Sequence, residues 1–257
     1  MWTVLPGLIL GMLAFVWVNR RIAKRVEAVT AAADAEMANV QKAAARGGAN
    51  VQMIMFNAIE RSVELLKRGF IFQNWQIGLK VMLNARIGML LYTRWLLGRQ
   101  MGNAKGPGVS EAIPYLEKSR VRGRKAQLLA ALWPAWAMLA VAYYKGKKDL
   151  DAAIKVLEET VKVAKKNGLL WSLYAWILVQ EKRNDAAIDV LARGKAAAPD
   201  DNYLAENLTL LQNGKALKMK SYGEQWYQFG LEMPPGAAAA MQPKMGHPRM
   251  RGGMRRR

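Results

Sequence analysis

The chain has no cysteine and a single histidine, His247, among its 257 residues. Without thiols it cannot form disulfides, bind a metal through thiolates or use a cysteine nucleophile. One histidine excludes catalytic triads built on that residue and metal sites that need two of them. Segments in which apolar and polar residues alternate between turns are scarce, so the pattern predicts helices rather than sheets. The residue types predict no enzyme, no metal site and no cofactor.

Two other features that could carry chemistry have simpler explanations. The glycine-rich segment Gly98–Gly108 lacks both the preceding strand and the Gly-Lys-Ser/Thr ending of a phosphate-binding loop. Glu158 and Glu159 are adjacent, and adjacent positions on a helix do not face each other. Asp149 and Asp185 precede predicted helices, where a carboxylate caps free N–H groups and favours the helix dipole. These observations turn the prediction from catalysis towards binding.

Negative charge is also in short supply. The chain has 39 Lys and Arg residues against 19 Asp and Glu, for a formal net charge of +20. Such an excess favours polyanions, meaning nucleic acid, anionic lipid or acidic protein surfaces. Contacts with polyanions are predicted from two clusters: Arg20, Arg21, Lys24 and Arg25 after the first apolar run, and Arg249, Arg251, Arg255, Arg256 and Arg257 at the C-terminus. A third basic cluster comprises Arg120, Arg122, Arg124 and Lys125.

One run without charge stands at the N-terminus, between Trp2 and Val18. Its basic flank lies on the C-terminal side, which the positive-inside rule keeps in the cytoplasm. We therefore predict a transmembrane anchor at residues 1–19, single-pass in the inner (cytoplasmic) membrane, with anionic lipid near its flank and the bulk of the chain in the cytoplasm. A signal peptide and a buried helix are the alternatives. Gly7 and Gly11 have the GxxxG spacing that lets two such helices pack, so an oligomer is compatible with the sequence.

The segments on either side of the central region differ in composition from it. Residues 20–48 combine the basic flank with an alanine-rich helical stalk, whose apolar residues are spaced by three and four. Residues 231–257 are rich in Pro, Gly, Ala, Met and Arg, and are predicted to form a disordered basic tail. The tail is suited to RNA, lipid or an acidic partner. It motivates an alternative function, that of a basic nucleic-acid- or ribosome-associated protein.

The central region contains an internal repeat. WAMLAVAYYKGKKDLDAAIKVLEET begins at Trp136, and WSLYAWILVQEKRNDAAIDVLARGKAAAP begins at Trp171. Ala153 and Ala187 lie 34 residues apart, whereas the two tryptophans lie 35 apart, so the turn in the first copy is one residue longer. A fixed period of this size is typical of helical solenoids, in which each unit buries its apolar face against its neighbours.

The second copy resembles the tetratricopeptide repeat (TPR). Trp171 falls on the family's first large aromatic position, Ala175 on the small residue of the first helix and Pro199 on the closing proline. The copy departs from the pattern at Tyr174, where Leu is usual, and at Gly194, where Ala is usual. Small residues let the paired helices approach, and proline ends the second helix.

The resemblance is clearest over residues 135–200 and implies an all-α helical-hairpin repeat solenoid behind the N-terminal transmembrane helix. The TPR-like domain is predicted to span residues 49–230. Fainter copies predict helices at residues 83–97, 110–119 and 202–212 and a closing helix at 215–229. Residues 126–144 are apolar enough for a second span, but Pro134 and the match to the repeat favour a buried helix.

Proteins similar to TPRs mostly bind other proteins on a concave surface lined by the first helix of each pair. Carried over by position, this surface would include Tyr144, Lys145, Ser172, Trp176, Val179 and Gln180. The alternative for Trp176 and Tyr144 is packing against a neighbouring helix. We therefore predict a membrane-anchored scaffold or adaptor that binds partner proteins at the cytoplasmic face of a membrane, within a larger assembly.

Overall fold

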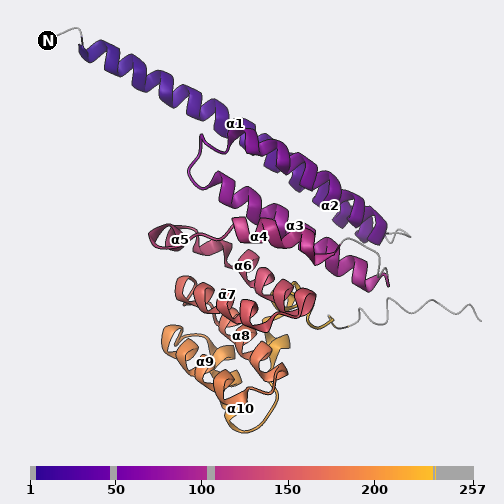
Figure 1. Ribbon diagram of the computed structural model, residues 1–257. Coiled ribbons are helices and arrows are strands. Elements are labelled where there is room, and N and C mark those ends of the chain that lie inside the picture. The colour runs from indigo at the N-terminus through magenta and orange to yellow at the C-terminus, as the bar shows by residue number, and fades with distance from the viewer. Residues whose placement is uncertain (1–3, 47–50, 103–107, 234, 236–257) are drawn as a thin grey trace, which may run out of the picture.

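The computed structural model describes residues 4–46, 51–102, 108–233 and 235, and every regular element in these ranges is helical. The helices stack in chain order from α1 at one end to α10 at the other, mostly in antiparallel pairs (Figure 1). Neighbours in sequence are therefore neighbours in space, as expected for a solenoid. The prediction of an all-α repeat fold is confirmed.

The first pair consists of α1 (Val4–Ala45) and α2 (Val51–Arg68). The second half of α1 buries Val26, Ala33 and Val40, which are spaced by seven residues along one stripe. A buried hydrogen bond from the Ser62 hydroxyl to the Ala33 carbonyl, 3.0 Å long, joins the two helices. Because α1 is continuous, no break in the helix separates the predicted anchor from the predicted stalk.

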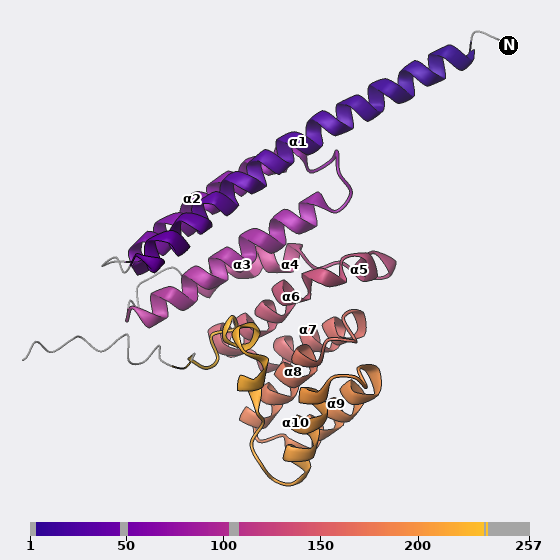
Figure 2. The same ribbon diagram turned by 180° about the vertical axis from the view of Figure 1, so that it is seen from behind.

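The first turns of α1 project beyond the rest of the stack (Figures 1 and 2). The side chains of Met12, Leu13, Phe15 and Trp17 are exposed there. Among the residues that the structure describes, no helix is both long and apolar enough to cross a membrane. Residues 1–3 and the side chains of residues 4–10, all within the predicted span, lie outside that description. The span predicted for residues 1–19 is thus not supported by the structure.

The repeat units follow as helix pairs: α3 (Leu79–Gln100) with α4 (Ala112–Lys118), α6 (Trp133–Val141) with α7 (Leu150–Val163), and α8 (Gly168–Gln180) with α9 (Asn184–Ala197), before α10 (Asn202–Gln212). Single turns precede two of these pairs: η1 (Gly69–Phe72) before α3, and η3 (Ala130–Leu132) before α6. A further turn, η2 (Val109–Glu111), leads into α4. The predicted helices at 83–97, 110–119 and 202–212 are therefore present, the first of them longer than predicted.

The two tryptophans that open the sequence repeat have the same structural role. The Trp136 indole N–H donates to the Ser119 carbonyl at 3.1 Å, and the Trp171 indole N–H donates to the Lys165 carbonyl at 2.8 Å. In each case the acceptor belongs to the end of the preceding unit. Each ring therefore packs in the core while its polar edge fixes the loop before it.

The extra residue of the first copy is accommodated by a change of helix type. The last turn after α6, Ala142–Lys147, is a π-helix, which fits one more residue into a turn than an α-helix does. After the π turn the two copies are in register again. Lys148 in the first copy and Lys182 in the second are equivalent positions, and they are the two non-glycine residues with positive φ in the described chain, 60° and 59°. They lie 34 residues apart, so the insertion is confined to the π turn.

Residues 126–144 do not form the single buried helix that was predicted. They comprise the end of α5 (Arg124–Leu128), the η3 turn, α6 and the start of the π-helix. Pro134 lies in the first turn of α6, where its missing N–H costs nothing. The part that matches the repeat, from Ala135 to Ala142, is buried as predicted.

The two predicted N-caps have different outcomes. Asp149 caps α7, since its carboxylate accepts from the Ala152 N–H at 2.9 Å. The prediction for Asp185 was wrong, because α9 begins one residue earlier, at Asn184. Asp185 lies in the first turn of α9, where its charge still favours the helix dipole.

Close helix packing depends on residues without a bulky side chain. A methyl group placed on Gly88 of α3 would lie 2.6 Å from Leu116 Cδ2, and one on Gly194 of α9 would lie 2.7 Å from the Trp171 ring. Gly194 therefore departs from the usual alanine because the ring of Trp171 fills that space. A methyl group on Gly98, also in α3, would meet nothing beyond its own helical turn within 4 Å.

These two glycines of α3 offer a matched test of the packing. We expect Gly88→Ala to lower the free energy of unfolding by about 1–3 kcal/mol, because the methyl group overpacks against Leu116. Gly98→Ala should be neutral or raise it by about 0.5–1 kcal/mol, because alanine favours the helix. Urea unfolding of the full chain measures both, and equal effects of the two substitutions would contradict the pairing of α3 with α4.

Candidate functional site

The residues predicted to line a partner-binding groove come together in the structure. Tyr144 and Lys145 belong to the π turn after α6, whereas Ser172, Trp176, Val179 and Gln180 follow one side of α8. The Lys145 ammonium lies 5.7 Å from the centre of the Trp176 ring, which joins the two groups. The Asn167 side chain starts α8 by accepting from the Leu170 N–H at 3.0 Å.

A segment of the same chain covers this face. We call residues Lys215–Met233 the strap. Leaving α10, the strap runs back across the stack towards α3 (Figures 1 and 2). It contains η5 (Met219–Tyr222) and α11 (Glu224–Tyr227). The single closing helix predicted over residues 215–229 is wrong, because Gly223 adopts φ +59° and interrupts it.

The strap fills the face with aromatic side chains. The Trp226 ring meets the Trp176 ring edge-on at a centroid distance of 5.5 Å, and the Phe229 ring lies 6.3 Å beyond it. Trp226 and Phe229 are both 0% exposed. The Tyr222 and Ser172 hydroxyls are hydrogen-bonded at 2.9 Å. The strap thus covers part of the surface that was predicted to bind a partner protein.

Backbone hydrogen bonds hold both ends of the strap. Near its start, the Lys218 N–H donates to Asn207 Oδ1 of α10 at 2.7 Å. At its end, the Tyr92 hydroxyl of α3 donates to the Phe229 carbonyl at 2.7 Å. Burial raises the pKa of Tyr92 above its ordinary value, so the hydroxyl remains a neutral donor. Gly230, with φ +61°, then turns the chain beside Leu96.

Three of the six predicted groove residues, Tyr144, Ser172 and Trp176, are therefore buried within the protein. The alternative for Trp176, packing against a neighbouring helix, agrees with its contact with Trp226 of α11. Val179 and Lys145 are half-buried, and Gln180 is exposed. A role in partner binding stays a prediction for all six.

An accessible edge remains where α3, the π turn and α8 end. We call it the lip, and it comprises Arg99, Lys145, Lys148, Val179 and Gln180. The Lys145 ammonium lies 4.9 Å from the centre of the Tyr144 ring, a cation–π contact. The Tyr144 hydroxyl donates to Glu181 Oε1 at 2.8 Å, which fixes the ring that supports the lysine.

The electrostatics of the lip favour an anion. Partial burial lowers the pKa of the Lys145 ammonium below its ordinary value, and the charges of Lys148 and Arg99 lower it further. Glu181 acts in the opposite direction but does not cancel these effects. An incoming carboxylate would relieve this repulsion, so the lip is suited to an acidic ligand.

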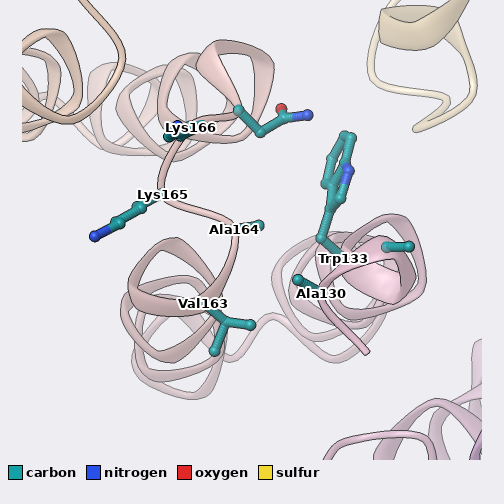
Figure 3. Close-up of a pocket in the computed structure, with 8 residues that line it drawn as sticks. Ala130, Trp133, Val163, Ala164, Lys165 and Lys166 are labelled. Atoms are coloured by element: carbon teal, nitrogen blue, oxygen red, sulfur yellow. The ribbon is translucent and has the colours of Figure 1, made fainter. Parts of the chain in front are cut away.

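A hollow lies between the start of α6 and the connection from α7 to α8 (Figure 3). It has a volume of about 460 Å³ and is lined by Ala130, Ala131, Trp133 and residues 163–167. Trp133 faces the hollow, whereas the Lys165 side chain points away from it (Figure 3). Its lining is mainly apolar and is suited to holding an apolar side chain.

The predicted polyanion-binding residues divide into two sets. Arg20, Arg21, Lys24 and Arg25 are exposed on α1. Arg249, Arg251, Arg255, Arg256 and Arg257 lie outside the described residues, as does nearly all of the predicted tail, so nucleic-acid binding through it stays a prediction. In the described part of the chain, no cluster of three His, Cys, Asp or Glu residues could hold a metal ion.

Sequence reasoning missed the strap. The segment YGEQWYQFG at residues 222–230 carries four aromatic residues in nine, too many for a solvent-exposed closing helix. That density is a usable signal of burial, since large aromatic side chains contribute most to a core. The signal does not predict where the segment packs, because nothing in the sequence near Trp226 specifies Trp176 as its partner.

A family model described as tetratricopeptide repeat matches residues 144–211, from the π turn through α10. Tetratricopeptide repeats generally bind other proteins, which agrees with a scaffold built from stacked helix pairs. The match lies within the region of the sequence repeat and supports the predicted resemblance. No curated protein and no solved structure matches the chain.

Trp226→Ala should detach the strap. Loss of a fully buried tryptophan costs about 3–5 kcal/mol, so we expect a large drop in stability and rapid trypsin cleavage at Lys218 and Lys220. Trp75→Ala removes a tryptophan that is 54% exposed and serves as the control, with cleavage at these lysines unchanged. Equal cleavage in Trp226→Ala and the unmodified chain would contradict the packing of the strap.

Proposed function

We propose that this protein is a membrane-attached helical-repeat scaffold that binds an acidic segment of a partner protein at the lip. The proposal rests on one observation: the concave face consists of a covered centre and an accessible edge. Its centre is filled by the strap, while the lip remains accessible and basic. A partner that follows the usual surface of this family would therefore meet Lys145 and its neighbours first.

The composition around the lip supports an acidic ligand. The sequence contains no Asp or Glu from Leu65 to Ser110 or from Lys118 to Lys148, and these two stretches contribute Arg99, Lys145 and Lys148. Charges at an interface rim speed association and select against partners of like charge. The buried Tyr144 and Trp176 rings lie beneath Lys145 and hold its ammonium at the surface by cation–π contacts.

The membrane attachment is supported by the sequence of the N-terminus. The uncharged run Trp2–Val18 is followed by four exposed basic residues, Arg20, Arg21, Lys24 and Arg25. Under the positive-inside rule this order favours a scaffold on the cytoplasmic side of the inner membrane, with anionic lipid beside the flank. A scaffold fixed there is suited to organising a larger membrane assembly.

A photocrosslinker at Gln180 of the full chain, in its native membranes, tests the lip. We expect Lys145→Glu with Lys148→Glu to reduce crosslinking to the partner about tenfold or more, equivalent to about 1.4 kcal/mol. Lys155→Glu with Lys162→Glu changes the net charge equally on the exposed face of α7 and should leave crosslinking intact. Equal loss in both variants, or in neither, would contradict recognition at the lip.

Fractionation of the same cells tests the attachment separately. The intact protein should sediment with membranes at high salt and be released by detergent, because burial of the apolar run does not depend on charge. Recovery of the intact chain as a soluble species would remove the attachment while leaving the lip result standing.

A further inference from the structure

Four large apolar side chains are strongly exposed at one edge of the stack. Ile71, Trp75 and Ile77, in the connection between α2 and α3, are 78%, 54% and 104% exposed. Leu128, at the end of α5, is 84% exposed. We call these four residues the edge cluster. Exposed apolar groups gathered in this way are typical of an interaction surface.

Contacts join the two loops that carry the edge cluster. A methyl group on Gly78 would lie 3.7 Å from Leu129 Cδ2, so the α2–α3 connection lies against the end of α5. A methyl group on Gly69 would lie 3.7 Å from Val29 Cγ1, so the same connection also lies against α1. Figures 1 and 2 show both loops on the side of the stack from which the first turns of α1 project.

The surroundings of the edge cluster are basic. The first carboxylate of the chain is Glu27, and the two stretches without Asp or Glu named above contain all four cluster residues. Three carboxylates lie near these basic residues: Glu159 of α7 pairs with Arg120 and lies 3.9 Å from Arg122, and the exposed Glu27 and Glu64 lie one turn from Lys24 and Lys67. The exposed basic residues on the neighbouring segments include Arg20, Arg21, Lys24, Arg25, Lys67, Arg68, Lys80, Arg122, Arg124 and Lys125.

The α2–α3 connection meets α1 just beyond the basic flank, on the side away from the uncharged run. At 1.5 Å per residue, Arg25 lies about 6 Å and Arg20 about 14 Å from the level of Val29, where the α2–α3 connection crosses. The headgroup layer of each leaflet is about 5–8 Å thick. Val18, at the end of the uncharged run, lies about 16 Å from the level of Val29, so the α2–α3 connection faces the outer side of the headgroup layer across the basic flank. Trp75 suits this zone, where tryptophan is enriched.

We propose that the edge cluster rests on an anionic bilayer surface, with its apolar side chains among the headgroups and the surrounding Lys and Arg residues on lipid phosphates. The proposal rests on the membrane attachment proposed above and adds a second contact, which fixes the orientation of the stack. The lip then faces away from the bilayer, because Gly78 and Arg99 stand at opposite ends of α3, about 30 Å apart.

The absence of cysteine permits a direct test with single labels on the full chain. Ile77→Cys and Leu128→Cys report the edge cluster, Leu13→Cys reports the uncharged run, and Gln180→Cys serves as the aqueous control at the lip. Each variant carries an environment-sensitive fluorophore. It is mixed with vesicles of phosphatidylcholine, alone or with phosphatidylglycerol, and quenched by spin-labelled lipid.

We expect the labels at 77 and 128 to shift to the blue and be quenched at least twofold on anionic vesicles, with no change at 180. If the label at 13 responds while those at 77 and 128 stay aqueous, the edge proposal is overturned and the attachment stands. The reverse pattern supports the edge cluster and removes the span. An equal response on neutral vesicles overturns the role of charge. A concentration-dependent shift without lipid overturns the proposal in favour of a second copy of the chain.

Discussion

The edge-on contact between Trp226 and Trp176 determines what the rest of the fold can do. It closes the concave face of the repeats with a segment of the same chain, and both Trp226 and Phe229 are fully buried there. Because the Tyr92 hydroxyl holds the Phe229 carbonyl, the strap also ties the last helices to α3. A solenoid normally transmits contacts only between neighbouring units, so this link adds long-range contacts that the repeats themselves lack.

The remaining surfaces acquire their roles from that closure. With the centre of the groove filled, the lip, where Lys145 lies over the Tyr144 ring, remains accessible. The edge cluster lies at the opposite end of α3, near the basic flank of α1. We therefore propose that one end of the stacked first helices faces lipid and the other faces a protein partner. The repeat fold separates the two by the length of a helix.

The sequence predicted the features that depend on residues close together in the chain. The 34-residue period, the cap at Asp149 and the burial of the two opening tryptophans all follow from spacing and residue type. The extra residue before Lys148 was visible as a length difference, but its accommodation in a π turn was not. Asp185 shows that element ends can shift by a residue. The strap could not be predicted, because its pairing with α8 joins residues 50 apart through aromatic shape, which has no sequence period.

Hydrogen exchange of the strap amides in the full chain tests the closure of the groove most directly. We expect the hydrogen-bonded amides of Lys218, Trp226 and Phe229 to exchange as slowly as those in the middle of α8, because they open only with the repeats. Strap amides that exchange as fast as those of an exposed loop, with α8 still protected, would show that the groove is open and would contradict the closure.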